Sequence, residues 1–266
     1  MKITILIEDT AEPGSGLGAE HGFSAFVEFG GKKILFDTGQ SGAFTENAER
    51  LGIDLNKTDF VVLSHGHFDH TGGLPAFLEK FDTEKMAFVS HPGIFEKKLH
   101  GSQWDIGCPL TRDEIVDAFK DCIFTDKPFE FIPGATFLGD VPRSYEDPGT
   151  CCDHVVGGAE EPDLVRDDSA IAFKTDKGIV LLTGCSHSGI LNLAKESEEM
   201  GRLYAIIGGF HLMGASRERL DRIISEFHKM GIKELRPGHC TGSEAIERME
   251  RELGAKRITT GEAINI

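Results

Sequence analysis

The sequence predicts an α/β fold with two β-sheets and helices packed on their outer faces. Hairpin signals occur in both halves of the chain, at Gly30-Gly31 and at Asp176-Lys177-Gly178. Around these hairpins, short β-type runs alternate with segments of helical periodicity, which is typical of layered α/β proteins. The alternation continues through both halves without a linker, so we expect a single domain over residues 1–266.

Each element is expected from its own local pattern. In the first half, runs of β-branched and aromatic residues predict strands at 2–8, 23–29, 32–37, 59–64 and 86–90. Amphipathic periodicity predicts helices at 41–52, 73–80 and 111–120. Thr71 is a candidate N-cap for the second of these helices, and Thr111 with Glu114 forms a capping box at the third.

The second half repeats the alternation after an irregular segment. Strands are expected at 170–175, 178–184, 203–209, 233–238 and 256–260, and helices at 189–200, 216–230 and 243–253. Residues 139–167 contain three prolines and clustered Gly and Asp, with little periodicity. Long irregular segments in a compact domain are usually functional or disordered, so we expect a lid or substrate wall there, with a passive surface insertion as the alternative.

The charge balance bears on the partners of the protein. The 266 residues carry 44 Asp and Glu against 28 Lys and Arg, a formal net charge of −16. This disfavours a nucleic-acid-binding protein, but a bound metal ion can still attract an anionic small-molecule substrate. The first residues read as a strand rather than a signal peptide and no run suits a membrane span, so we expect a cytoplasmic protein. A homodimer is compatible with the sequence.

The strongest chemical signal lies at residues 64–70, with the sequence SHGHFDH, after an apolar strand and before a helix. Imidazole and carboxylate are the usual ligands of Zn, Mn and Fe. Side chains two apart on an extended segment point the same way, so His65 and His67 can share one ion. Once the chain turns, Asp69 and His70 can face a second ion beside it. A merely His-rich surface loop is the alternative.

This His-x-His-x-Asp-His run resembles the metallo-β-lactamase superfamily. Residues 33–39, KILFDTG, resemble that superfamily's early strand ending in an Asp, and residues 233–239, KELRPGH, resemble its last ligand motif. The resemblance implies a four-layer αββα sandwich with a metal site at one edge, where loops from both halves meet. Asp37 is then expected to hold the His-rich loop by accepting imidazole N–H bonds.

A narrower resemblance rests on four further motifs, HGFS at 21–24, GCSHSGI at 184–190, GGFHL at 208–212 and GHCTG at 238–242. Together they resemble the 7,8-dihydropterin-6-yl-methyl-4-(β-D-ribofuranosyl)aminobenzene 5′-phosphate synthases. The resemblance implies transfer of a dihydropterin-methyl group from its diphosphate to an aryl ribofuranosyl phosphate acceptor, in tetrahydromethanopterin-type biosynthesis. The alternative is a metal-dependent hydrolase of a phosphoester or lactone, with metal-bound hydroxide as the nucleophile.

The resemblance also implies the remaining ligands. The expected metal-ligand set is His65, His67, Asp69, His70, His187 and His239. Many relatives carry an Asp after a Thr-Gly pair where this chain has Cys185, which either binds as a thiolate or merely packs. We expect two divalent ions, with Zn as the first choice and Mn or Fe as alternatives.

Catalytic roles are expected for Asp69 and for His211, the latter as a proton-transfer group. Metal binding by His211 and a purely structural role for it stay open, as does metal binding by His91. The histidines expected to bind no metal are His21, His100, His154 and His228. No dinucleotide fingerprint or P-loop sequence occurs, so no cofactor-binding residues are expected.

Overall fold

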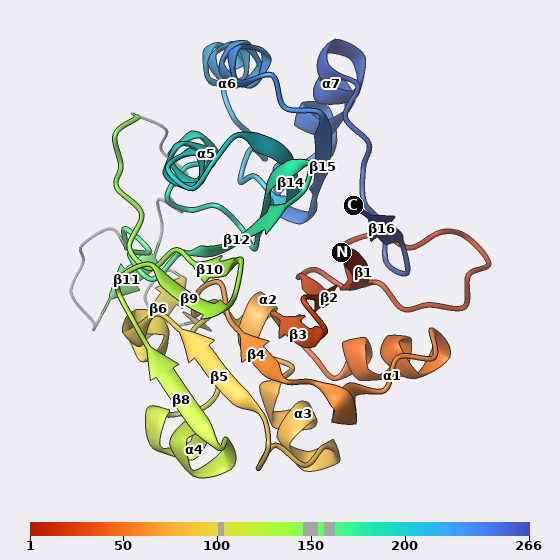
Figure 1. Cartoon of the computed structure of the whole chain (residues 1–266), viewed down its shortest axis with the longest axis vertical. Helices are drawn as coiled ribbons and strands as arrows, with labels where there is room; N and C mark the ends of the chain where they lie inside the picture. Colours follow the sequence, from red (N-terminus) through yellow and green to blue (C-terminus); the bar gives the residue numbers. More distant parts are fainter. Residues whose placement is uncertain (101–103, 146–153, 157–162) are drawn as a thin grey trace.

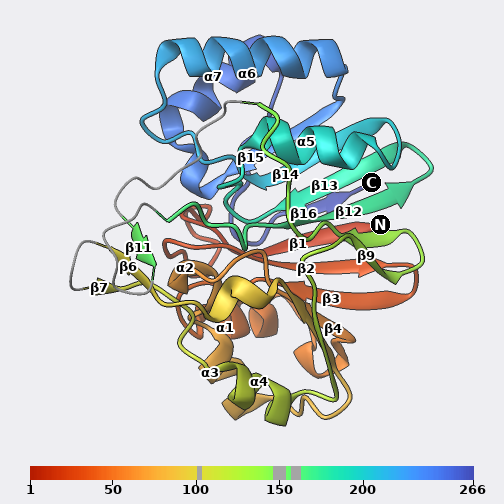
Figure 2. The same ribbon diagram turned by 90° about the vertical axis from the view of Figure 1, so that its left-hand side faces the viewer.

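Two β-sheets lie face to face between two layers of helices, as Figures 1 and 2 show. The computed structural model describes residues 1–100, 104–145, 154–156 and 163–266. The predicted αββα sandwich is therefore confirmed within this part of the chain. Among the described residues, no helix has the length and apolar character that a membrane span requires.

The first sheet is built from the N-terminal half, and the C-terminal strand adds to one of its edges. Its order is β16-β1-β2-β3-β4-β5-β8. The bounds are β1 Lys2–Ile7, β2 Ser24–Phe29, β3 Lys32–Phe36, β4 Phe60–Val62, β5 Ala87–Ser90, β8 Asp121–Phe124 and β16 Ala263–Asn265. Strands β3, β4, β5 and β8 run parallel, so their carboxyl ends meet at one edge.

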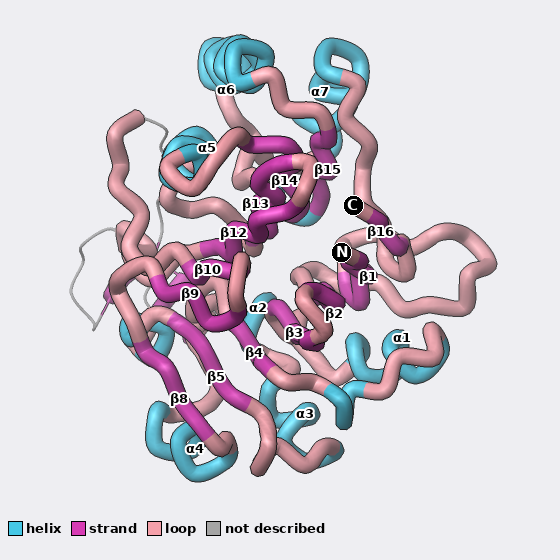
Figure 3. The backbone as a smooth tube through the Cα atoms, viewed as in Figure 1, coloured by secondary structure: helices cyan, strands magenta, loops and turns pink. Residues whose placement is uncertain are grey.

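The second sheet belongs to the C-terminal half, with the order β15-β14-β13-β12-β10-β9. Its bounds are β9 Phe129–Ile132, β10 Ala135–Phe137, β12 Ala170–Thr175, β13 Gly178–Thr183, β14 Leu203–Gly209 and β15 Glu234–Gly238. Strands β13, β14 and β15 are parallel neighbours, which again gathers the loops that follow them at one edge. Figure 3 shows the strands of both sheets stacked across the middle of the molecule.

The apolar faces of the sheets explain why they stack. Phe23 and Phe36 of the first half and Phe137 and Phe173 of the second belong to one fully buried cluster between the sheets. Burying an aromatic side chain stabilises a fold by roughly 1.5–3 kcal/mol, so this layer is a major source of stability. Because both halves share this core, we propose that residues 1–266 form one domain.

Helices cover the outer face of each sheet. On the first sheet lie α1 Ala43–Arg50, α3 Leu74–Lys80 and α4 Arg112–Ala118, and on the second α5 Ile190–Glu198, α6 Arg217–Met230 and α7 Ser243–Leu253. The capping box of Thr111 and Glu114 is confirmed. The N-cap at Thr71 is wrong, because Thr71 ends the single-turn helix α2, Phe68–Thr71, and its hydroxyl donates to the carbonyl of His67.

One predicted strand is wrong as well. Residues 256–260 form no strand: although Lys256 and Ile258 donate to the carbonyls of Leu235 and Pro237, the strand pairing of this segment is limited to an isolated bridge between Thr260 and Ala11. The last strand is instead β16, which pairs antiparallel with β1. A short apolar run fits either placement, so only the pairing partner decides between them.

A third, small sheet stands beside the sandwich at the edge with the α2 turn (Figure 2). Its order is β11-β6-β7, from β6 Lys98–His100, β7 Trp104–Asp105 and β11 His154–Val156. The predicted lid at 139–167 lies partly outside the described residues, which omit 146–153 and 157–162. Of its described parts, β11 belongs to this small sheet and residues 163–167 lead into β12.

Candidate metal centre

The candidate ligands lie on loops that follow strand ends. His65, His67, Asp69 and His70 follow β4, His187 follows β13, and His239 follows β15. Parallel strands deliver such loops to the same edge, so residues from both halves meet there. All six predicted metal ligands are buried at this place.

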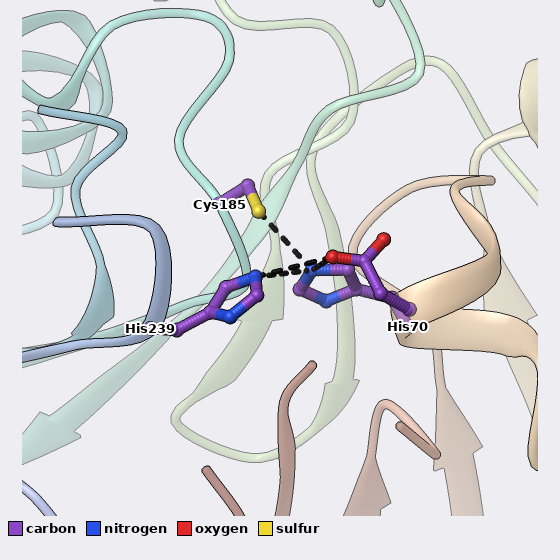
Figure 4. A group of neighbouring side chains, drawn as sticks. His70, Cys185 and His239 are labelled. Carbon is purple, nitrogen blue, oxygen red and sulfur yellow. Dashed lines mark hydrogen bonds and ion pairs between the residues drawn. The ribbon is translucent and has the colours of Figure 1, made fainter. Parts of the chain in front are cut away.

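The first donor group combines Asp69, His70, Cys185 and His239, whose ligand atoms all lie within 4.8 Å of one another. His70 Nε2 lies 3.3 Å from His239 Nε2 and 3.1 Å from Cys185 Sγ (Figure 4). Asp69 Oδ2 lies 3.3 Å from His239 Nε2 and 3.6 Å from His70 Nε2. Two nitrogen ligands of a tetrahedral Zn ion, each about 2.0–2.1 Å from it, lie roughly 3.3 Å apart, which matches these separations.

Carboxylates on the far side of each ring fix which nitrogen faces this group. Asp37 Oδ2 lies 2.7 Å from His70 Nδ1, and Asp9 Oδ1 lies 2.7 Å from His239 Nδ1. A carboxylate only accepts, so each Nδ1 carries the proton and each Nε2 presents a lone pair. Two lone pairs 3.3 Å apart repel unless a cation or a proton lies between them. The donor set therefore fits a metal ion.

The pKa values follow the same logic. Burial raises the pKa of Asp69, but electrostatic interactions with His70, His239 and His67 and a hydrogen bond with His239 outweigh it and hold that pKa far below its usual range. Burial lowers the pKa of His239, yet Cys240, Asp69 and Asp9 raise it well above 6.5. Both directions favour positive charge beside Asp69, and a metal ion would supply it.

The second donor group joins His65 and His187 to Cys185, with ligand atoms within 4.8 Å of one another, and His67 lies beside this group. His65 Nε2 lies 3.0 Å from His67 Nδ1, and the ring centroid of His187 lies 4.7 Å from each of the other two. Ser64 Oγ donates to Asp37 Oδ2 and accepts from His65 Nδ1 at 2.9 Å, so His65 Nε2 presents a lone pair. Burial and the surrounding imidazoles hold the pKa of His65 well below 6.5, which keeps it neutral, the form that binds metals.

Cys185 is the residue that the two groups share. Its Sγ lies within 4.8 Å of the ligand atoms of the first group, and also of those of His65 and His187. A third group, with three ligand atoms within the same 4.8 Å, joins Cys185 to His211 and Cys240. The sequence left the role of Cys185 open, and the structure places its sulfur where it could contact ions at both groups.

His211 and His91 were the other open questions. The ring of His211 lies 4.3 Å from that of His187 and lines the cavity above the donor groups. His91 Nε2 lies 2.9 Å from Asp140 Oδ1, and its Nδ1 accepts the N–H of Gly93. Both nitrogens of His91 are therefore engaged elsewhere, and among the described residues it belongs to no donor group.

Sequence reasoning missed Asp9, His21 and Cys240. His21 was expected to bind no metal, yet its Nδ1 lies 3.0 Å from Asp9 Oδ2 and its Nε2 3.4 Å from Asp69 Oδ2. Asp9, His21 and His239 form a fourth candidate group. The available signal was that Asp9 closely follows β1, at the same edge as the predicted ligands.

Backbone strain concentrates at this centre. Among the described residues, positive φ angles outside glycine occur at Asp37, Val165, Ser186, His211 and His239. Such conformations cost of order 1–3 kcal/mol each and persist where surrounding contacts enforce them, commonly at functional sites. The surrounding fold thus holds Asp37 and His239 in strained conformations that aim them at the donor groups.

A cavity of about 460 Å³ opens above the donor groups. Its polar lining includes Asp69, Cys185, His67, His187 and His239, and its apolar wall is formed by Phe68, Trp104, Ile106 and Met213. Trp104 is 73% exposed, which is unusual for so large an apolar side chain. The small sheet thus supplies one exposed aromatic side chain, Trp104, beside the polar lining.

An αββα sandwich with clustered His, Asp and Cys donors at one edge defines a class of metal-binding proteins. The family model described as the metallo-beta-lactamase superfamily matches residues 17–165, and the chain belongs to this superfamily. The resemblance inferred from the sequence is therefore confirmed.

Three similar proteins cover nearly the whole chain. A 7,8-dihydropterin-6-methyl-4-(beta-D-ribofuranosyl)-aminobenzene-5′-phosphate synthase of Methanocaldococcus jannaschii is 32% identical, over 95% of this chain and 92% of its own length. An uncharacterised protein of the same organism is 34% identical over 94% of both chains. A crystal structure described as a metal-dependent hydrolase of the beta-lactamase superfamily has a TM-score of 0.87 at 30% identity and covers 100% of this chain and 99% of its own.

Proposed function

We propose that this protein is a dinuclear metal enzyme that transfers a dihydropterin-methyl group from its diphosphate to an aryl ribofuranosyl phosphate acceptor. The observation that carries this proposal is a cavity with an apolar wall beside two groups of candidate metal ligands. The apolar wall suits a flat ring, and bound metal ions would suit an anionic leaving group. The 32% identity to a synthase of this kind supports the same substrate class. We propose a cytoplasmic enzyme without nucleic-acid or membrane partners.

The ligands divide between two ions. His65 and His187 would hold one ion together with His67, whose Nδ1 lies 3.0 Å from His65 Nε2. Asp69, His70 and His239 would hold the other ion, and Cys185 belongs to both groups. Mixed N, O and S donors favour Zn, with Mn or Fe as alternatives. When bound, the ions supply positive charge that stabilises a leaving diphosphate.

The protein's own groups would orient the substrates and take up a proton. In the transfer, the acceptor's bond to the methylene carbon forms, the methylene–oxygen bond to diphosphate breaks, and the acceptor loses a proton. His211 lines the cavity beside His187 and would accept that proton. Asp69 would help to hold the ion that binds the leaving diphosphate. Trp104 and Phe68 would shield the pterin ring from water.

A hydrolase of a phosphoester or lactone is the second candidate. The 30% identity to a metal-dependent hydrolase over the whole chain favours it, and the same donors would serve. Water would then replace the acceptor as the attacking group.

One assay separates the two candidates. Diphosphate release from dihydropterin-methyl diphosphate is measured with Zn-loaded protein, with and without ribofuranosylaminobenzene phosphate. Release that requires the acceptor and yields the condensed product supports the transferase, and release without it supports the hydrolase. His67→Ala should abolish either activity, whereas His228→Ala, on the exposed face of α6, should not. Synthesis that persists in His67→Ala, or no release at all, would contradict the proposal.

A further inference from the structure

Residues 167–169 run between the two loops that carry the second donor group. The Asp167 Oδ2 atom accepts the N–H of Gly66 at 2.7 Å. Gly66 lies between His65 and His67, so this bond holds the backbone from which both imidazoles project. The N–H of Ser169 donates to the carbonyl of Ser64 at 2.9 Å, which ties the same loop a second time.

The next residue holds the opposite loop. Asp168 Oδ2 accepts the N–H of Ser188 at 2.8 Å, and the Ser188 hydroxyl donates to the main-chain carbonyl of Asp168. Ser188 directly follows His187. Two adjacent carboxylates therefore bind the backbones of two loops that lie more than a hundred residues apart in the sequence.

A buried lysine, Lys98, forms an ion pair with the first of these two carboxylates. Lys98 is 1% exposed, and its Nζ lies 2.7 Å from Asp167 Oδ1 and 3.4 Å from Asp163 Oδ2. A buried charge is costly unless it is paired and hydrogen-bonded, and Asp167 satisfies both conditions through Lys98 and Gly66. Lys98 also belongs to β6, the strand from which the chain continues to Trp104.

We propose that Asp167 and Asp168 are positioning residues that set the spacing between the His65–His67 loop and His187, and through it the affinity for the ion that these three histidines share. Among the described residues, neither carboxylate belongs to a donor group, so each would act on the metal ligands through the backbone of a ligand loop. The proposal rests on the metal centre of the proposed function but on neither its substrate nor its reaction. Partners that orient metal ligands typically change metal affinity by about 10–100-fold when they are removed.

The chain offers a matched control. Asp163 also contacts Lys98 and is also buried, but its Oδ1 accepts the N–H of Val165 rather than that of a ligand loop. Asp163→Ala therefore removes the same charge and the same atoms from the same cluster without touching Gly66 or Ser188. Asp168→Asn is the conservative variant, because an amide oxygen can still accept from Ser188.

Zinc binding to the full-length protein tests the proposal without any substrate. Affinity and stoichiometry are measured by competition with a chromogenic chelator, and Co(II) absorption spectra report the coordination of each ion. We expect Asp167→Ala and Asp168→Ala to lower the binding affinity for one ion by about 10–100-fold and to change the Co(II) absorption bands of that site. The affinity for the other ion should stay unchanged. Asp163→Ala and Asp168→Asn should bind both ions nearly as the unmodified protein does. Thermal unfolding of the metal-free forms checks that each variant folds.

Two results would overturn the proposal while leaving the metal centre intact. One is unchanged affinity for both ions in Asp167→Ala and Asp168→Ala. The other is an equal loss in Asp163→Ala, which would mean that the charge cluster matters only for folding. Failure of the unmodified protein to bind Zn would instead contradict the proposed function, and this inference with it.

Discussion

The carboxylate of Asp37 lies 2.7 Å from Nδ1 of His70, and both side chains are 0% exposed. The same carboxylate accepts the N–H and the hydroxyl of Ser64, so one residue after β3 fixes the start of the ligand loop and a ligand inside it. Burial leaves no room for solvent to replace a lost partner. The tautomer of His70 therefore depends on Asp37.

We predict that Asp37→Asn impairs metal binding at the group containing His70 and His239. The amide oxygen can still accept from Ser64, which turns the amide NH₂ toward His70 Nδ1 and moves the imidazole proton to Nε2, where it blocks ligation. The Zn affinity of this one site should fall by about 10–100-fold, as measured by chelator competition. Asp176→Asn, in an exposed turn, is the control, and equal affinities in the two variants would disprove the role of Asp37.

The close approach of Gly66 to the carbonyl of Ile94 leads to a second prediction. A Cβ at Gly66 would overlap the backbone of Ile94, which cannot move as a flexible side-chain end can. We expect Gly66→Ala to lower the free energy of unfolding by roughly 1–3 kcal/mol and to weaken zinc binding, because the backbone between His65 and His67 must shift. Gly18→Ala meets only ordinary contact with Asn47 and should leave urea unfolding curves unchanged. Similar curves for both variants would contradict the prediction.

Trp104 is the only tryptophan of the chain, so its fluorescence reports on one wall of the cavity. We expect a dihydropterin to quench it in metal-free protein, because a flat ring would stack on this exposed side chain. Trp104→Ala should raise KM by roughly threefold to tenfold with little change in kcat. Phe129→Ala, an exposed aromatic on β9 away from the cavity lining, is the control. An absence of quenching would remove Trp104 from the binding wall.

Asp168 leads to a prediction about pH. Burial raises the pKa of its carboxyl to about 6, although Ser188 and the His187 backbone partly offset this. Its unfolded pKa is about 3.9, so the folded state holds the proton more tightly. Protonation of Asp168 therefore contributes to the free energy of unfolding in full below about pH 4, and this contribution is lost as the pH rises through about 6.

Asp168→Asn has no titrating group at this position, so its free energy of unfolding does not fall for this reason as the pH rises. In chelator-treated protein, we expect the free energy of unfolding of the variant, relative to the unmodified protein, to rise by about 1–2 kcal/mol between about pH 5 and pH 8. Asp176→Asn should show no such trend. A difference that does not change with pH would show that the Asp168 carboxyl keeps an ordinary pKa when buried.

The distance between residues along the chain decided what the sequence could predict. The ligand run from His65 to His70 is contiguous and follows a buried strand, so its chemistry could be inferred from the order of residues alone. Asp9 contacts His239 across 230 residues, and only the pairing of distant strands brings them together. Strands of two or three residues, such as β7, carry too little pattern to be recognised from sequence.

Cys185 shows the remaining limit. Its motif indicated a ligand position with an unusual residue, but whether the sulfur faces the site depends on the strained turn at Ser186. The structure places the sulfur 3.1 Å from His70 Nε2 and within 4.8 Å of the ligand atoms of His65 and His187. A thiolate at this point would favour soft ions over Mn.

We therefore predict that Co(II)-substituted protein shows a near-ultraviolet sulfur-to-metal charge-transfer band that Cys185→Ser lacks. The variant should also lose Zn affinity relative to Mn, because a hydroxyl is a harder and weaker ligand than a thiolate. Cys122→Ser is the control, since that sulfur donates to the carbonyl of Ile115 under α4. If the band persists in Cys185→Ser and vanishes in Cys240→Ser, the thiolate ligand is Cys240, and Cys185 only packs beside it.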